Sequence, residues 1–221
     1  MTSHLIQIRS AADPAVNGEG APASIALPRS LDERSAVAAA SMAEMVRLAG
    51  RVAVALTVAC SVIALAVHVW FAAAARHWLA FPFAGIPARP GEAASIFSHN
   101  LRALAAVGGM LLIAQSAYWT AGTEQPGPPC GTLRRLGEAL LGAAVAANLI
   151  VIGASFGAYG TRMLQAALPH GPVELAAYSI ALSLYVNARS RPFPTRHLLA
   201  VMALSTSLLA IAAVLETYVN L

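Results

Sequence analysis

Residues 52–75 read VAVALTVACSVIALAVHVWFAAAA, and His68 is the only side chain among them that can carry a positive charge. A hydrocarbon core about 30 Å thick is crossed by about 20 residues of α-helix, which satisfies its own backbone hydrogen bonds in lipid. Trp70 and Phe71 lie near the end of the stretch, and such aromatic residues are typical of the membrane interface. The stretch therefore predicts a transmembrane helix.

Four more apolar segments follow along the chain, at about 103–121, 136–159, 172–188 and 198–220. The segment 172–188 is short and holds Glu174 near its start, whereas the last segment is apolar except for Glu216. These patterns predict an all-α fold, a polytopic transmembrane helix bundle of about five helices.

The composition agrees with this prediction. Of 221 residues 58% are hydrophobic and 11% are charged, against roughly 25% charged in soluble domains. All 14 basic residues are arginines, and they flank the apolar segments instead of forming one basic patch, so we expect no nucleic-acid partner. Cys60 lies in an apolar segment and Cys130 in a Pro/Gly-rich connection, so the two cysteines predict no disulfide framework.

The segment 1–45 precedes the membrane domain, to which we assign residues 46–221. Residues 1–28 lack any apolar period, which predicts a disordered cytoplasmic tail. Ser30 and Glu33 have the spacing of a capping box, so a helix is expected to begin there. No apolar run follows the first residues at once, which indicates that the N-terminus is retained and is not a signal peptide.

The arginines also predict the orientation of the chain, because cytoplasmic loops carry an excess of basic residues. With the N-terminus inside, ten arginines are cytoplasmic: Arg9, Arg29, Arg34, Arg47, Arg51, Arg134, Arg135, Arg189, Arg191 and Arg196. Four are outside: Arg76, Arg89, Arg102 and Arg162. Without the distant Arg9 and Arg29 the count is still eight against four, which favours an inside N-terminus.

Ionisable and amide side chains within the apolar segments are the candidate functional residues, because they are costly in lipid unless they are paired or hydrated. The set comprises Asn100, Asn148, His170, Glu174 and Glu216, and we add Gly171, which lies at the expected helix entry between His170 and Glu174. His170 and Glu174 are one turn apart if a helix begins near His170, so they can hydrogen-bond each other, and Gly171 with Pro172 suits a helix entry.

Three interpretations of this set stay open. Metal binding would use His170 and Glu174, but catalytic zinc takes three protein ligands and the chain has no HExxH motif. A proton or ion relay would place Glu174 and Glu216 beside a hydrated cavity. In the preferred interpretation these polar groups satisfy one another, with Asn148 among them, and fix the packing of the helices.

Glycines predict where helices approach each other closely. Gly153 and Gly157 have GxxxG spacing, and the pair Gly108–Gly109 lies in the second apolar segment. His68 is interpreted as a packed or interfacial histidine. Glu138 is expected to pair with Arg134 or Arg135. The chain has no phosphate-binding loop, so we expect it to hydrolyse no nucleotide by itself.

Several of these stretches are similar to a known family. Residues 168–175, LPHGPVEL, resemble the LPHGxxEL stretch of the stage II sporulation protein M family of bacterial membrane proteins. Asn100, Asn148 and Glu216 lie in stretches that resemble its second, third and last helices. The likeness covers about residues 46–221. His99 stands where the family often has asparagine, and Leu149 where it often has glycine.

The resemblance implies a multi-pass protein of the bacterial cytoplasmic membrane that scaffolds or organises partners and is not an enzyme, with no cofactor and no metal. Expected partners are the lipid bilayer and other membrane or envelope proteins, with a peptidoglycan hydrolase or a separate ABC ATPase as candidates. An oligomer is compatible with this role. The alternative function is a permease-like subunit of an ABC-type export or bacteriocin production and immunity system. A third is an intramembrane metal-dependent hydrolase.

Overall fold

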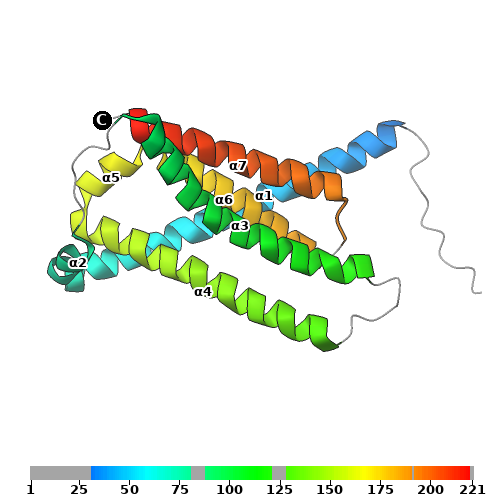
Figure 1. Ribbon diagram of the computed structural model, residues 1–221, viewed down its shortest axis with the longest axis horizontal. Helices are drawn as coiled ribbons and strands as arrows, with labels where there is room; N and C mark the ends of the chain where they lie inside the picture. Colours follow the sequence, from blue (N-terminus) through cyan, green and yellow to red (C-terminus); the bar gives the residue numbers. More distant parts are fainter. Residues whose placement is uncertain (1–30, 81–87, 121–127, 191, 220–221) are drawn as a thin grey trace, which may run out of the picture. The chain divides into compact units, whose positions relative to one another are not determined.

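The computed structural model describes residues 31–80, 88–120, 128–190 and 192–219, and every element among them is helical (Figure 1). The chain divides into two compact units, residues 1–38 and 39–221. Of the first unit, only the start of α1 (Leu31–Ala66) is described. A helix thus begins beside the predicted capping box, although Ser30 and the predicted tail at 1–28 lie outside the described residues. Residues 31–45, assigned to the tail from the sequence, are α-helical.

Seven elements follow α1 in the described part of the chain. They are η1 (Val67–Phe71), α2 (Ala72–Leu79), α3 (Pro90–Thr120), α4 (Pro128–Tyr159), α5 (Thr161–Ala167), α6 (Gly171–Ala188) and α7 (Thr195–Tyr218). Among the described residues, four stretches are long and apolar enough to cross a membrane: Met42–Leu79, Pro90–Ser116, Gly131–Tyr159 and Thr195–Tyr218. Many of their large apolar side chains are exposed, such as Val62, Leu140 and Ile211. These helices suggest a membrane protein, and the predicted helical bundle is confirmed.

The predicted fourth span, 172–188, coincides with α6, but α6 is not among the four stretches that are apolar enough to cross a membrane. Its position explains this composition. The helix packs against both α3 and α7, and Ser179 and Ser183 are buried within it. Because α6 faces protein over much of its surface, it can hold polar side chains that lipid would disfavour.

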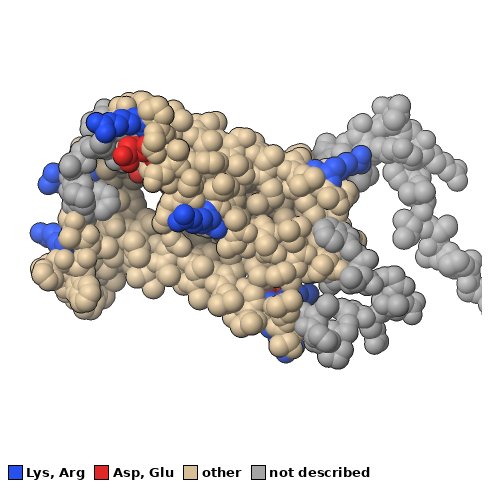
Figure 2. Space-filling view, viewed as in Figure 1, with Lys and Arg blue, Asp and Glu red and all other residues tan. Residues whose placement is uncertain are grey.

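Helices α3, α6 and α7 lie side by side and form the core of residues 39–221 (Figure 1). Ala177 and Ala181 of α6 are fully buried between Leu104 of α3 and Leu209 of α7. Small residues let helix backbones approach closely, which gives van der Waals contact where lipid supplies no hydrophobic driving force. Figure 2 shows that uncharged side chains cover most of one face of the described chain, with the charged groups mostly towards its ends.

A second layer is formed by α4 with η1 and α2. The π-helical segment η1 continues α1 into α2, and the Nδ1 atom of His68 lies 3.2 Å from the carbonyl oxygen of Gly157 on α4. After α4 the chain turns at Gly160, whose φ of 57° favours glycine, and α5 then leads to the start of α6. This connection places the beginning of α6 at the same end of the bundle as the end of α4.

Candidate functional site

The starts of α3 and α6 and the end of α7 meet around a cavity of about 380 Å³. We call it the polar cavity. Its walls carry seven side chains: Ser95, Ile96, His99 and Asn100 from α3, His170 and Glu174 from the start of α6, and Glu216 from α7. Four of the six predicted polar-site residues therefore come together, from three helices that are distant in sequence.

Asn100 and Glu174 form a direct polar link at this cavity. The Nδ2 atom of Asn100 donates a hydrogen bond to Oε1 of Glu174 at 2.5 Å. One turn further along α6, the Tyr178 hydroxyl donates to the backbone carbonyl of Asn100 at 3.0 Å. Glu174 also lies in the first turn of α6, where the helix dipole favours a negative charge. These contacts join α3 to α6. Tyr178 was not among the candidate residues predicted from the sequence.

His170 does not pair with Glu174 as expected from their spacing. Its Nε2 atom lies 4.0 Å from Oε2 of Glu216 on α7, while Glu174 is bound to Asn100. His170 is the N-cap residue of α6, just before the first helical turn, and α7 brings Glu216 beside its ring instead. The Nδ1 atom of His170 is buried and has no hydrogen-bond partner within the described part of the chain.

A larger cavity of about 920 Å³ lies between the two helix layers. We call it the apolar cavity. Its walls come from α1, α3, α4, α5 and α6, and most of them are aliphatic, as at Leu56, Leu149 and Ile152. The two cavities share Asn100, His170 and Glu174, so the polar cavity opens beside one end of the apolar cavity. Figure 2 shows a hollow in the described surface near this end, where α2 and α5 lie in Figure 1.

Asn148 lines the apolar cavity but takes no part in the hydrogen bonds of the polar cavity. Its Nδ2 atom donates to the carbonyl oxygen of Ala144, one turn earlier in α4, at 2.9 Å. The expectation that Asn148 pairs with the histidine and carboxylates therefore does not match the structure. An asparagine within a helix can satisfy its amide on its own backbone and needs no second helix.

The predicted packing glycines lie in different surroundings. A Cβ atom at Gly153 would lie 2.8 Å from the side chain of Ile63, and one at Gly157 would collide with the backbone oxygen of Ala64, so both glycines allow the close approach of α1 and α4. At Gly108 the nearest atom is Cε of Met202, at 3.2 Å. Gly109 has no neighbour within 4 Å of the added atom and so makes no close packing contact, contrary to expectation.

Gly171 lies in the first turn of α6, where an added Cβ would be 3.7 Å from the Cβ of Ala167, an ordinary contact. Its position suits a helix entry, with Pro172 directly after it in the first turn. The residues therefore explain where α6 begins, and no side-chain contact makes glycine essential there.

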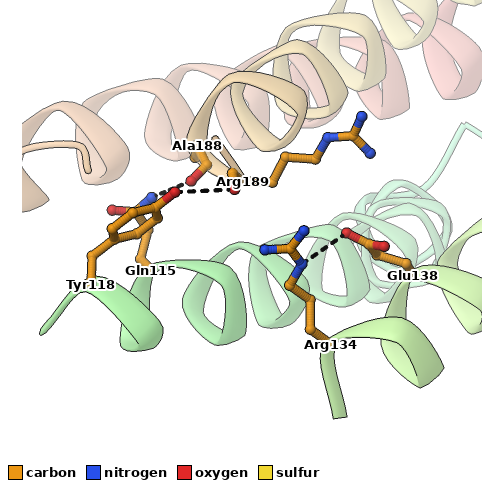
Figure 3. Close-up of polar contacts among 6 residues, drawn as sticks. All are labelled: Gln115, Tyr118, Arg134, Glu138, Ala188 and Arg189. Atoms are coloured by element: carbon orange, nitrogen blue, oxygen red, sulfur yellow. Dashed lines mark hydrogen bonds and ion pairs between the residues drawn. The ribbon is translucent and has the colours of Figure 1, made fainter. Parts of the chain in front are cut away.

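A second polar region lies at the opposite end of the α3–α6–α7 core (Figure 3). Gln115 is fully buried; its Nε2 atom donates to the carbonyl oxygen of Ala188 at 2.6 Å, and its Oε1 atom accepts from the backbone amide of Phe193 at 2.9 Å. The Tyr118 hydroxyl donates to the carbonyl oxygen of Arg189 at 3.2 Å. These bonds satisfy backbone groups where α6 ends. This role of Gln115 was not predicted, although an amide side chain within an apolar segment was the signal for it.

Figure 3 also shows Arg134 and Glu138, which form the predicted ion pair within α4, with 3.3 Å between Nε and Oε1. Both side chains are partly exposed, so the pair contributes little to stability. His68, interpreted from the sequence as a packed or interfacial histidine, contacts the carbonyl oxygen of Gly157 through its ring, while the residue itself is exposed.

Within the described residues, no three histidine, cysteine, aspartate or glutamate side chains gather in a way that could hold a metal ion. The donor set at the polar cavity therefore does not fit a three-ligand zinc site. No family model matches the chain, and no curated protein or solved structure matches it either. The resemblance to the stage II sporulation protein M family stays a prediction from the sequence.

Proposed function

We propose that the chain is a non-catalytic membrane subunit of the stage II sporulation protein M type, which organises partner proteins in the bacterial cytoplasmic membrane. The observation that carries this proposal is that polar side chains inside the bundle form hydrogen bonds between helices and at a helix end. Asn100 binds Glu174 between α3 and α6, and Gln115 binds backbone groups where α6 ends. Such interhelical bonds contribute roughly 0.6–2 kcal/mol each and fix one helix arrangement. A rigid bundle of this kind suits a docking platform.

The proposal includes five spans and a cytoplasmic N-terminus, with α6 as the additional span. A helix of 18 residues is about 27 Å long, close to the thickness of the hydrocarbon core. The start of α6 would then lie on the outer side, together with Arg102 and Arg162. The distribution of arginines supports this orientation.

Cysteine labelling tests the orientation. In a variant without Cys60 and Cys130, a cysteine replaces either Gln165 on α5 or Ser190 beyond α6. A membrane-impermeant maleimide is expected to label the Gln165→Cys protein in intact cells, and the Ser190→Cys protein only after permeabilisation. The reverse pattern would contradict the orientation. Labelling of both from the outside would contradict α6 as a span.

Purification from native membranes tests the organising role. The tagged chain is expected to retain a stoichiometric partner, either a peptidoglycan hydrolase or an ATP-binding-cassette ATPase, that an unrelated polytopic protein of equal abundance does not retain. The purified chain alone is expected to show no hydrolase activity. A robust metal-dependent hydrolysis by the pure protein, abolished in His170→Ala, would show that the role is enzymatic.

One observation favours the permease-like alternative: the polar and apolar cavities adjoin inside the bundle, with Glu174 at their junction and Glu216 in the wall of the polar cavity. In this function Glu174 and Glu216 would border a transport path, and a separate ATPase would supply the energy. Vesicles reconstituted with chain and ATPase would show substrate flux that is lost in Glu174→Gln. The control is Glu138→Gln, because Glu138 lines neither cavity. Equal flux in both variants would argue against this path.

A further inference from the structure

The two cavities together have the form of a site for an amphiphilic molecule. The apolar cavity, at about 920 Å³, falls within the roughly 300–1,000 Å³ of typical small-molecule sites. Three polar side chains, Asn100, His170 and Glu174, line it where it meets the polar cavity. A ligand that fills both would have an apolar tail and one polar head.

The charged side chains around the polar cavity favour one sign of charge on the polar head of the ligand. Glu174 and Glu216 line the polar cavity, and no arginine lines either cavity within the described residues. Arg102 and Arg162 belong to this end of the bundle by sequence but are in neither wall. Low-dielectric walls strengthen the attraction between an acidic site and a cation, and they equally strengthen the repulsion of a carboxylate or phosphate.

The junction also holds an unused hydrogen-bonding atom. Nδ1 of His170 is buried without a partner, while Nε2 of the same ring lies near Glu216. Buried polar atoms in native proteins normally have a partner, so an atom without one in a cavity wall is available to a group from outside the chain. A neutral ring nitrogen can accept a hydrogen bond from an ammonium group.

We propose that the joined cavities bind a cationic amphiphile, an aliphatic chain with a protonated amine head, with the ammonium between Glu174, Glu216 and His170 and the chain in the apolar cavity between α1, α4 and α6. This inference goes beyond the organising role and does not depend on it. The head would form charge-assisted hydrogen bonds to the carboxylates, and the tail would cover aliphatic walls such as Leu149 and Ile152.

Photolabelling tests the site in the full chain reconstituted in nanodiscs of zwitterionic lipid. The probe is dodecylamine with a diazirine at the end of its tail, and crosslinked residues are identified by mass spectrometry. Saturable labelling is expected on residues that line the apolar cavity, and excess dodecylamine is expected to abolish it. Dodecanoate, with the same tail and the opposite charge, and butylamine, with the head alone, are expected to compete at least tenfold less well.

Three variants locate the two halves of the site. Glu174→Gln removes the charge but keeps a carbonyl oxygen for Asn100, and Glu216→Gln removes the other charge; each is expected to weaken labelling about tenfold, as loss of a charge-assisted bond does. Ala144→Phe fills the apolar cavity and is expected to block it. Glu138→Gln, which removes a carboxylate of α4 outside both cavities, is expected to leave labelling unchanged.

Several outcomes would overturn the proposal. Equal competition by dodecanoate would show that the apolar cavity takes any acyl chain, as it would if bulk lipid filled it. Labelling spread evenly over the exposed faces of α1 and α4 would show that no cavity is used. Full labelling of folded Glu174→Gln and Glu216→Gln proteins would show that the two carboxylates do not bind the head group. None of these results affects the partner purification that tests the organising role.

Discussion

The two ends of the α3–α6–α7 core both contain polar side chains, but they use them differently. At one end, Gln115 is fully buried and its amide is bonded to Ala188 and Phe193. At the other end, the side chains of His170 and Glu216 are 16% and 25% exposed and line an open cavity. A polar group satisfied by backbone fixes a fold, whereas a polar group that faces a cavity is available to something else. The comparison separates a structural region from a candidate site.

The largest expected effect lies at the structural end. Gln115→Leu leaves the Ala188 carbonyl and the Phe193 amide without their side-chain partner, so we expect about 3 kcal/mol loss in the free energy of unfolding. Reversible unfolding of the purified protein in mixed micelles measures it. The matched control is Gln165→Leu on exposed α5, which should change stability by less than about 0.5 kcal/mol. Equal losses in both variants would remove the distinction between the ends.

Gly157→Ala tests whether the close approach of α1 and α4 shapes the wall of the apolar cavity. The added methyl would meet the backbone oxygen of Ala64, so one helix must shift, at a cost of about 2 kcal/mol. The control is Gly142→Ala in the same helix, where the added atom meets nothing and stability should rise by up to about 1 kcal/mol. Thermal unfolding of both variants gives the comparison. A neutral Gly157→Ala would mean that this contact is not tight.

The cavity end should tolerate an isosteric change. In Glu174→Gln the new carbonyl oxygen can still accept the hydrogen bond from Asn100, and a partly buried charge is removed. We therefore expect a change below about 1 kcal/mol in the free energy of unfolding. The same unfolding assay applies. If this variant lost more stability than Gln115→Leu, the carboxylate would be a structural element and the comparison would be reversed.

The smallest effect is expected on α4 at the structural end. Glu138→Gln breaks a partly exposed ion pair with Arg134, which contributes about 0.5 kcal/mol, and high salt should reduce the difference further. Unfolding at two salt concentrations measures it. A loss as large as that of Gln115→Leu would place this pair among the determinants of the fold.

The apolar segments were enough to predict the five long helices, since a helix of about 20 residues satisfies its own backbone in lipid, but they did not predict the short helix α5 or the start of α3 before residue 103. The start of α6 also followed from Gly171 and Pro172. The partners of the polar side chains did not follow, because they depend on which helices are neighbours. Spacing along one helix suggested that His170 binds Glu174, but α7 brings Glu216 to the histidine instead. Gln115 was missed because its partners are backbone groups of another segment.

The π-helical segment η1 determines which side of the helix the following residues occupy. A π turn accommodates one more residue than an α turn, and one residue corresponds to about 100° of rotation around the helix axis. Within this segment the ring of His68 contacts the carbonyl oxygen of Gly157, and after it the carbonyl oxygen of Arg76 lies 3.4 Å from the Tyr159 hydroxyl. Deleting a single alanine from 72–75 would leave the hydropathy almost unchanged, yet it would rotate one of these contacts away from α4. In this segment, the contacts with α4 depend more on the rotation of the helix about its axis than on its amino-acid composition.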